Sequence, residues 1–185
     1  MLKKIGFILV FVLMTFSAKA SFVLIPMDVD SQNDHLKAYG ITYWVLNNGQ
    51  NVQWLLNYRG GSFLIPDSER LRQECTIRGV TYEVISNAEA ETILSNIDSP
   101  SQNQESVLLE KAPKIAVYTP SGKKPWDDAV TLVLTYAEIP YETVYDKSVL
   151  NDELLLYDWL HLHHEDFTGQ YGKFYRAYRA TPWYI

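Results

Sequence analysis

The chain has little cysteine: Cys75 is the single cysteine among its 185 residues. One thiol cannot form an internal disulfide, so the fold must be held by its apolar core. Cys75 lies one helical turn after Leu71, which favours a small buried residue. A nucleophilic role is the alternative, but no histidine or acid is placed beside it to activate the thiol.

Basic residues are also in short supply, with 16 lysines and arginines against 22 aspartates and glutamates. Lys3, Lys4 and Lys19 belong to the first twenty residues, which contain no acidic residue. The remainder therefore carries 13 basic residues against 22 acidic ones. A domain of this charge is a poor match for the phosphate backbone, so we expect no nucleic-acid partner.

No apolar run is long enough to cross a bilayer comfortably, which takes about 20 residues. The run from Ile5 to Phe16 follows two lysines and precedes the small-x-small sequence Ala18-Lys19-Ala20. This layout predicts a signal peptide over residues 1–20, with an uncleaved anchor as the alternative. We expect a mature chain starting at Ser21, exported to the periplasm or secreted, without membrane insertion after cleavage.

The sequence contains no Walker loop and no G-x-G-x-x-G fingerprint. Two short glycine loops occur instead, at residues 59–62 and 119–124. Thr119 and Gly122 lie between a predicted strand and a predicted helix, which is the context for binding an anion at a helix N-terminus. Asp127 and Asp128 in the first helical turn oppose an anion, so phosphate binding and ligand binding of another kind both stay open.

What the sequence does contain predicts an α/β fold. Residues 21–97 form an N-terminal α/β part. Apolar or alternating runs predict strands at 21–27, 52–58, 62–65 and 80–85. Helices are expected at 36–47, from a cap at Asp67 to Arg78, and after the capping-box sequence Ser86 to Glu89. Residues 98–111 are predicted to be a linker loop because their first part is polar and contains no aromatic residue.

Residues 112–185 predict a βαβ part with parallel strands and a right-handed crossover. Its strands are expected at 114–118, 141–145 and 157–163, and a helix begins at Pro125. The aromatic and basic tail from Gly172 predicts a helix whose apolar face expects a sheet beneath it. Three parallel strands bury little core, which favours a domain that is incomplete at its C-terminus over a complete small domain.

Three of the four histidines lie in one stretch, at positions 161, 163 and 164. His161 and His163 are two residues apart on the predicted strand, so they project from one face. With a third ligand from the residues that follow, they could bind a divalent metal such as zinc. Imidazoles hydrogen-bonded to backbone at a polar strand end are the alternative.

The loop after this strand is the main candidate for chemistry, because ligands bind beyond the carboxyl ends of parallel strands. We expect this end beside Thr119 and Asp146, with Leu160 and Leu162 buried on the face opposite His161. The candidate acid/base residues are His163, His164, Glu165 and Asp166, and the candidate binding residues also include Thr168 and Gly169. A solvated loop without catalysis is the alternative, since no nucleophile is assignable beside them.

The chain resembles a family of exported bacterial proteins that carry the name asparagine synthetase B. The resemblance covers essentially all of the chain after residue 20 and rests on these stretches: Leu24-Ile-Pro-Met-Asp28, His35-Leu-Lys-Ala-Tyr-Gly40, Leu56-Asn-Tyr-Arg-Gly-Gly61, Pro125-Trp-Asp-Asp-Ala-Val130 and residues 157–170. It implies a parallel-sheet, flavodoxin-like fold of the class I glutamine amidotransferase type, in proteins longer than this chain.

Asparagine synthesis itself is not expected. The true cytosolic enzyme uses a cysteine directly after the initiator methionine and a Ser-Gly-Gly-x-Asp-Ser loop for ATP, whereas Leu2 and Arg59-Gly-Gly-Ser62 stand here. Two functions therefore remain: binding of a small ligand, with or without amidohydrolase-like chemistry, at the edge formed by residues 161–169, or a non-catalytic role with a partner protein of the cell envelope.

Overall fold

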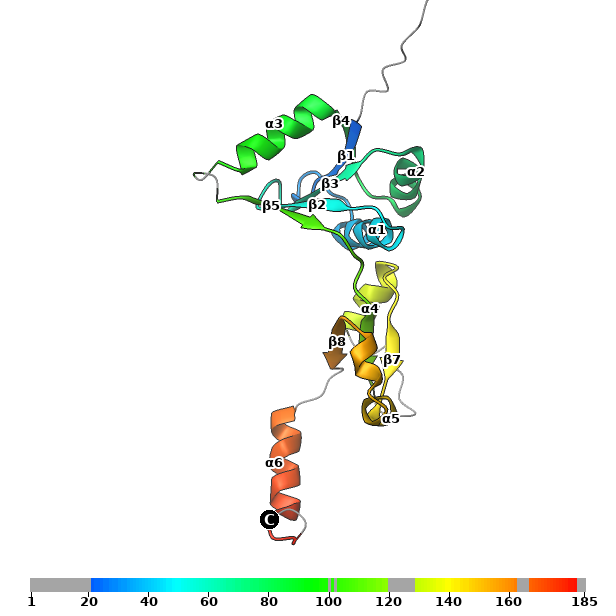
Figure 1. Cartoon of the computed structure of the whole chain (residues 1–185), viewed down its shortest axis with the longest axis vertical. Helices are drawn as coiled ribbons and strands as arrows, with labels where there is room; N and C mark the ends of the chain where they lie inside the picture. Colours follow the sequence, from blue (N-terminus) through cyan, green and yellow to red (C-terminus); the bar gives the residue numbers. More distant parts are fainter. Residues whose placement is uncertain (1–20, 100, 102, 120–128, 163–166, 183–185) are drawn as a thin grey trace, which may run out of the picture.

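A computed structural model describes residues 21–99, 101, 103–119, 129–162 and 167–182. The predicted signal peptide lies outside these residues. Figure 1 shows one sheet in the upper part of the molecule and a second sheet below it along the long axis. A helix lies below both sheets and apart from them. The protein is thus a mixed α/β structure with one five-stranded and one three-stranded sheet.

The first sheet is antiparallel throughout, with strand order β4-β1-β3-β2-β5. Its strands are β1 (Ser21–Ile25), β2 (Val52–Leu56), β3 (Ser62–Pro66), β4 (Glu83–Ser86) and β5 (Glu105–Leu109). The parallel sheet that we expected for the fold is therefore not found in this part of the chain. The turn between β2 and β3 is too short to join parallel strands, which need a long crossover connection. Strands joined in this way are therefore antiparallel.

Helices cover both faces of this sheet. On one face α1 (His35–Asn47) and α2 (Glu69–Arg78) pack against Val23, Ile25 and Ile65. On the other face α3 (Asn87–Ile97) packs against Leu24 and Leu64. Because successive side chains of a strand point to opposite faces, two covered faces require strands that are apolar at every position.

Local capping signals account for the helix ends. Ser86 and Glu89 form the expected capping box at the start of α3. Gly79 ends α2 in the left-handed conformation, at φ 71°. The cap of α2 is Ser68, whose side chain accepts a hydrogen bond from the Leu71 N–H, so the prediction of Asp67 was wrong. The Asp67 carboxylate instead accepts a hydrogen bond from Ser21 Oγ at 2.8 Å.

The predicted linker loop at 98–111 is also corrected in part. Residues Glu105–Leu109 form strand β5, which pairs with the whole length of β2. The prediction weighed the polar residues at 98–104 and overlooked Val107, Leu108 and Leu109. Apolar residues at the open edge of a sheet add a strand because pairing satisfies their backbone groups.

The second sheet is parallel, as the βαβ pattern predicted, with strand order β7-β6-β8. Its strands are β6 (Ile115–Tyr118), β7 (Glu142–Val144) and β8 (Trp159–Leu162). They are connected by α4 (Ala129–Tyr136), by α5 (Asp146–Leu150) and by the 3₁₀ turn η2 (Glu153–Leu156). The parallel orientation expected for the strand at 157–163 is thereby confirmed, and the neighbour of this strand is β6.

The two faces of this sheet are covered unequally. On one face, Ile115 and Val117 are buried against Leu134 of α4. Register places Ala116 with Leu160 and Tyr118 with Leu162 on the opposite face. We call the first sheet with its helices the first unit, and the second sheet with α4, α5 and η2 the second unit. Among the described residues of the second unit, α5 is the only α-helix on this face. The connection from β6 to β7 and the connection from β7 to β8 run in opposite directions across the sheet. Because such crossovers share one handedness, they place α4 and α5 on opposite faces. Since α5 has five residues, it leaves much of its face uncovered.

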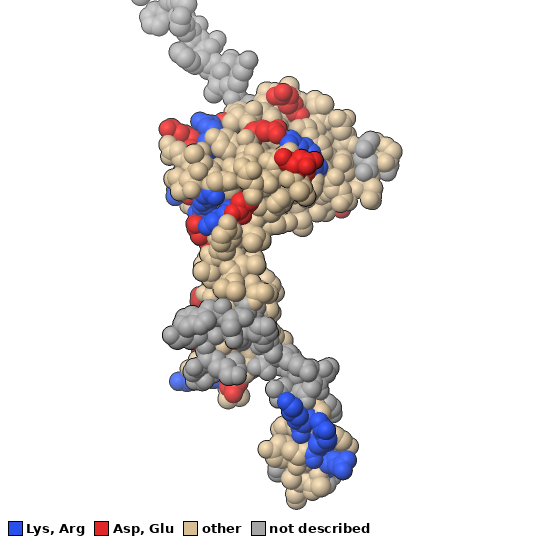
Figure 2. All heavy atoms as spheres, turned by 180° about the vertical axis from the view of Figure 1, so that it is seen from behind, with Lys and Arg blue, Asp and Glu red and all other residues tan. Residues whose placement is uncertain are grey.

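The last helix, α6 (Phe167–Tyr178), confirms the helix expected in the tail. Phe174 and Tyr178 lie one turn apart with ring centroids 4.7 Å from each other, and both are partly exposed. Figure 2 shows basic side chains gathered on this lower helix. The sheet that we expected beneath its apolar face is not seen, since the helix lies away from both sheets in Figure 1.

The expected burial of Cys75 in the core is confirmed. Both Cys75 and Leu71 are fully buried between α2 and the first sheet. Burial raises the pKa of the Cys75 thiol to about 12, which keeps it protonated and unreactive near neutral pH. A nucleophilic role for this cysteine is therefore not supported by its surroundings.

Candidate functional site

The carboxyl ends of the three parallel strands meet at one edge of the second sheet. Tyr118 ends β6 opposite Leu162, which ends β8, and Asp146 begins α5 directly after β7. The Tyr118 hydroxyl donates a hydrogen bond to Asp146 Oδ1 at 2.5 Å. Strand order brings these residues together because β6 lies in the middle, between β7 and β8.

A pocket of about 500 Å³ opens at this edge, on the face shared with α5. Its walls are mostly apolar, and Asp146 and the Tyr118 hydroxyl are its polar groups. The residues that line it are Tyr118, Asp146, Val149, Leu150, Leu160 and Leu162. Apolar walls with a few convergent polar groups are the usual composition of a small-molecule site.

The expected burial of Leu160 and Leu162 is wrong. Register does place them on the face opposite His161, but they are 37% and 42% exposed. Leu150 of α5 is 83% exposed beside them. The prediction rested on the alternation of the strand alone, and α5, with five residues, covers only part of this face.

Thr119 lies where it was expected, at the end of β6. Its N–H donates to the Val144 carbonyl at 2.9 Å, which ties it to the neighbouring strand. Its side chain is buried, and Oγ1 has no hydrogen-bond partner among the described residues. A buried hydroxyl without a partner costs about 1–3 kcal/mol. Thr119 is not among the residues that line the pocket, so its expected role in binding stays a prediction. Gly122, the second candidate of this loop, lies outside the described residues.

The candidate acid/base residues His163, His164, Glu165 and Asp166 also lie outside the described residues, so their role stays a prediction. Thr168 and Gly169 fall within the first turn of α6, and not in a loop as expected. We had placed the start of the tail helix at Gly172, whereas α6 begins earlier, at Phe167.

His161 is described, and it does not belong to the pocket. It pairs with Val117 on the face opposite Leu160, and its ring lies 6.5 Å from the ring of Trp159. The predicted metal pair of His161 and His163 is therefore seen only in its first member. Among the described residues, no group of three or more histidine, cysteine or acidic side chains could hold a metal ion.

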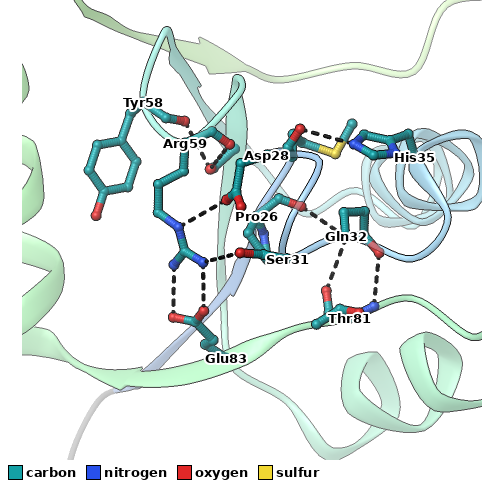
Figure 3. Close-up of polar contacts among 11 residues, drawn as sticks. Pro26, Asp28, Ser31, Gln32, His35, Tyr58, Arg59, Thr81 and Glu83 are labelled. Atoms are coloured by element: carbon teal, nitrogen blue, oxygen red, sulfur yellow. Dashed lines mark hydrogen bonds and ion pairs between the residues drawn. The ribbon is translucent and has the colours of Figure 1, made fainter.

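A second cluster of polar residues surrounds Arg59, in the turn between β2 and β3 (Figure 3). Its guanidinium donates to Asp28 at 3.2 Å, to Ser31 at 3.1 Å and to Glu83 at 3.0 Å. The hydrogen bond that Arg59 donates to Glu83 is the main cause that raises the pKa of Arg59, and burial partly opposes it. Asp28 has a lowered pKa, first through its hydrogen bond with Ser31.

This Arg59 cluster ties three chain segments together. Arg59 itself has a φ of 44°, in the left-handed region, and its carbonyl accepts a hydrogen bond from the Met27 N–H at 2.9 Å. Beside it, the buried Gln32 side chain donates to the carbonyls of Pro26 and Thr81. Each of these groups has a partner within the protein, so the cluster fixes loop geometry and offers no free group for chemistry.

Sequence reasoning found the glycine turn at 59–62 and missed the arginine's partners. Arg59 and Asp28 are 31 positions apart, and no periodic pattern links them. The motif Leu24 to Asp28 and the motif Leu56 to Gly61 were singled out separately. The structure shows that they lie side by side because β1 and β3 are neighbours.

Comparison of the chain with protein-family models, with curated proteins and with solved structures gave no match. Within the ranges that the structure describes, no helix combines the length and the apolar character needed to span a membrane.

Proposed function

We propose that the chain is an exported α/β binding protein, and that it binds a small ligand at the carboxyl edge of its parallel sheet. We also propose that the chain is related to the exported bacterial proteins named asparagine synthetase B. Its second half then has a flavodoxin-like fold of the class I glutamine amidotransferase type. The proposal excludes asparagine synthesis, because the residues required for that reaction are missing from the sequence.

The strand order β7-β6-β8 supports the flavodoxin-like assignment. Numbered along the chain, the second strand lies on one side of the first and the third strand on the other. This is the 2-1-3 start of flavodoxin-like sheets, whereas the Rossmann order places the second and third strands as neighbours. Ligands of such sheets bind where the order reverses, between the first and third strands.

The single observation that carries the proposal is the pocket at this reversal. Tyr118 of β6 and Leu162 of β8 both line it, at the carboxyl ends of their strands. Asp146 is exposed at the same edge and provides a carboxylate that can accept hydrogen bonds. The ligand that fits is a small molecule with an apolar body and a cationic donor group such as an amine.

Export is tested separately from binding. The predicted signal peptide gives a mature chain that starts at Ser21, and mass spectrometry of the protein recovered from outside the cytoplasm measures this terminus. Finding Met1 or Leu2 at the mature terminus contradicts the proposal. A cytoplasmic location of the intact chain also contradicts it.

Binding is tested with phenethylamine and its neutral analogue 2-phenylethanol, measured by ligand-observed NMR. We expect Asp146→Asn to weaken binding of the amine about tenfold, equal to about 1.4 kcal/mol, because the charge-assisted hydrogen bond is lost. Asp30→Asn is the matched control, since Asp30 is an exposed carboxylate of the first unit. Equal binding of the amine by Asp146→Asn and Asp30→Asn contradicts the proposal.

A second function is favoured by the exposed leucines of α5 and η2. Leu150 of α5 and Leu155 and Leu156 of η2 are largely exposed. Exposed apolar side chains that gather into a patch mark protein interaction sites, and these leucines are candidates for such a patch. In this alternative the face binds an envelope protein and carries no small ligand. Leu155→Asp then abolishes partner binding, while phenethylamine binds neither the wild type nor any variant.

A further inference from the structure

A second pocket, of about 260 Å³, lies between the two sheets. Side chains of α1, β2, β3 and β5 line it from the first unit, and side chains of β6, α4 and β8 from the second. It shares no lining residue with the pocket at the carboxyl edge. Clefts between structural units are common positions for ligand sites.

Aromatic rings form much of the wall of this interunit pocket. In the first unit, Phe63 is buried and stacks on Trp54 with ring centroids 6.2 Å apart and an interplanar angle of 23°. Tyr39 meets Phe63 edge to face, at 5.6 Å and 76°. Trp159 of β8 lines the pocket from the second unit. Tyr39 and Trp159 are each 44% exposed, so solvent reaches the pocket at these two rings.

Three polar side chains of the lining, Tyr43, Trp54 and Thr42, already have hydrogen-bond partners within the protein. The Tyr43 hydroxyl donates to the Pro113 carbonyl at 3.0 Å, and Trp54 Nε1 donates to the Gly61 carbonyl at 3.1 Å. Thr42 Oγ1 donates to the Ala38 carbonyl at 3.0 Å. No charged side chain is among the lining residues. A charged ligand would lose its hydration here without gaining a partner.

Contacts beside the pocket hold the two units in place. Lys37 of α1 forms an ion pair with Glu138 at 2.7 Å, and Arg78 at the end of α2 contacts the same carboxylate at 3.2 Å. The Tyr136 hydroxyl of α4 donates to Asp34 at the start of α1. The walls are thus positioned before a ligand binds, which lowers the entropic cost of binding.

We propose that this interunit pocket binds a neutral, flat, apolar molecule of one or two rings. The volume lies just below the range of about 300–1,000 Å³ found for drug-sized ligands, which sets the ligand's size. Its ring stacks against the aromatic walls, and its neutrality matches the absence of a charged side chain from the lining. This site is independent of the proposed site at the carboxyl edge and can exist without it.

Naphthalene is the probe, and 2-naphthoate is the same ring system with a negative charge. Saturation-transfer NMR on the mature chain should detect naphthalene binding and should detect no comparable binding of 2-naphthoate. Trp159→Ala should weaken naphthalene binding about tenfold, since aromatic contacts provide most of the affinity. Tyr39→Ala is a second variant at the mouth of the pocket, for use where Trp159→Ala does not fold.

Trp44→Ala is the matched control, because Trp44 packs against Arg70 and does not line the pocket. Asp146→Asn should leave naphthalene binding unchanged, so a failure at the carboxyl edge can be told apart from a failure here. Equal binding by Trp159→Ala and Trp44→Ala overturns the proposal, and so does equal binding of naphthalene and 2-naphthoate. Absent naphthalene binding, with a dimer in sedimentation that Trp159→Ala abolishes, overturns it in favour of a second copy of the chain.

Discussion

Gly40 in α1 packs directly against the backbone carbonyl of Ala137, just after α4. A Cβ atom added at Gly40 would lie 1.8 Å from the Ala137 oxygen, which no real contact allows. Ala137 is itself buried, and its N–H donates to the Val133 carbonyl at 2.8 Å. The lack of a side chain at Gly40 is therefore what lets the two units approach closely.

We predict that Gly40→Ala destabilises the protein by about 1–3 kcal/mol, the usual cost of overpacking. The gain in helix propensity, about 1 kcal/mol for alanine over glycine, opposes this effect and does not remove the overlap. Urea denaturation measures the difference. Gly172→Ala in α6 is the control, since the described residues place no atom within 4 Å of its added Cβ apart from the backbone of its own helix and its chain neighbours. Equal stability of the two variants would contradict the close contact.

Acid should weaken the contact between the units. Burial acts to raise the pKa of Asp34, but hydrogen bonds from Tyr136 and from the Lys37 N–H outweigh it and lower the pKa below its usual 3.8. The hydrogen bond from Lys37 lowers the pKa of Glu138 below its usual 4.5. Carboxyls with lowered pKa stabilise the fold above their unfolded pKa, and this contribution is lost as pH falls through their folded pKa.

Urea denaturation from pH 7 down to about pH 3 measures this loss. Glu138→Gln should flatten the dependence of stability on pH, because it removes one of the two titrating groups. On the alkaline side, the hydrogen bond to Asp34 raises the pKa of Tyr136 above 10.0. That contribution is present below pH 10 and is lost as pH rises through the folded pKa, and Tyr136→Phe should remove it.

The partly covered face of the second sheet, which carries Leu160, should contribute less to stability than the core of the first sheet. Leu64 is buried in the first sheet, so Leu64→Ala should cost about 2–5 kcal/mol. Leu160 is 37% exposed, and we predict about 1 kcal/mol for Leu160→Ala because less apolar area leaves water there. Thermal or urea unfolding compares the two. A cost at Leu160 equal to that at Leu64 would show that another element covers this face in solution.

Cys75 should react slowly with Ellman's reagent in the folded protein. With a pKa raised from 9.0 to about 12, the thiolate fraction near neutral pH falls about 10³-fold, and burial adds a steric barrier. The thiol should react fully in urea. Fast labelling of the native chain would show that α2 opens readily or that Cys75 is exposed.

Arg59 is held at a positive φ of 44°, where a residue other than glycine is strained. Arg59→Gly removes the ion pairs with Asp28 and Glu83 and also relieves the backbone, whereas Arg59→Ala only removes the ion pairs. Arg59→Ala should therefore be less stable than Arg59→Gly, by about 1 kcal/mol in urea denaturation. The reverse order would argue against strain at this position.

The sequence alone predicted the elements that depend on local chemistry. The capping box at Ser86 and Glu89, the left-handed end of α2 at Gly79 and the burial of Cys75 beside Leu71 each rest on residues within one or two turns. The βαβ pattern predicted parallel strands for the second sheet. These features are readable because their partners lie close together in the chain.

Other features depend on contacts between residues far apart in the chain, and only the tertiary structure decided them. Periodicity marked strands but not their neighbours, so the antiparallel first sheet and the pairing of β5 with β2 were not predicted. Burial of Leu160 failed because alternation specifies a face, while the length of the covering helix sets how much of that face is buried. The Arg59 cluster and the aromatic pocket between the units likewise join residues that only the packing of the two sheets brings together.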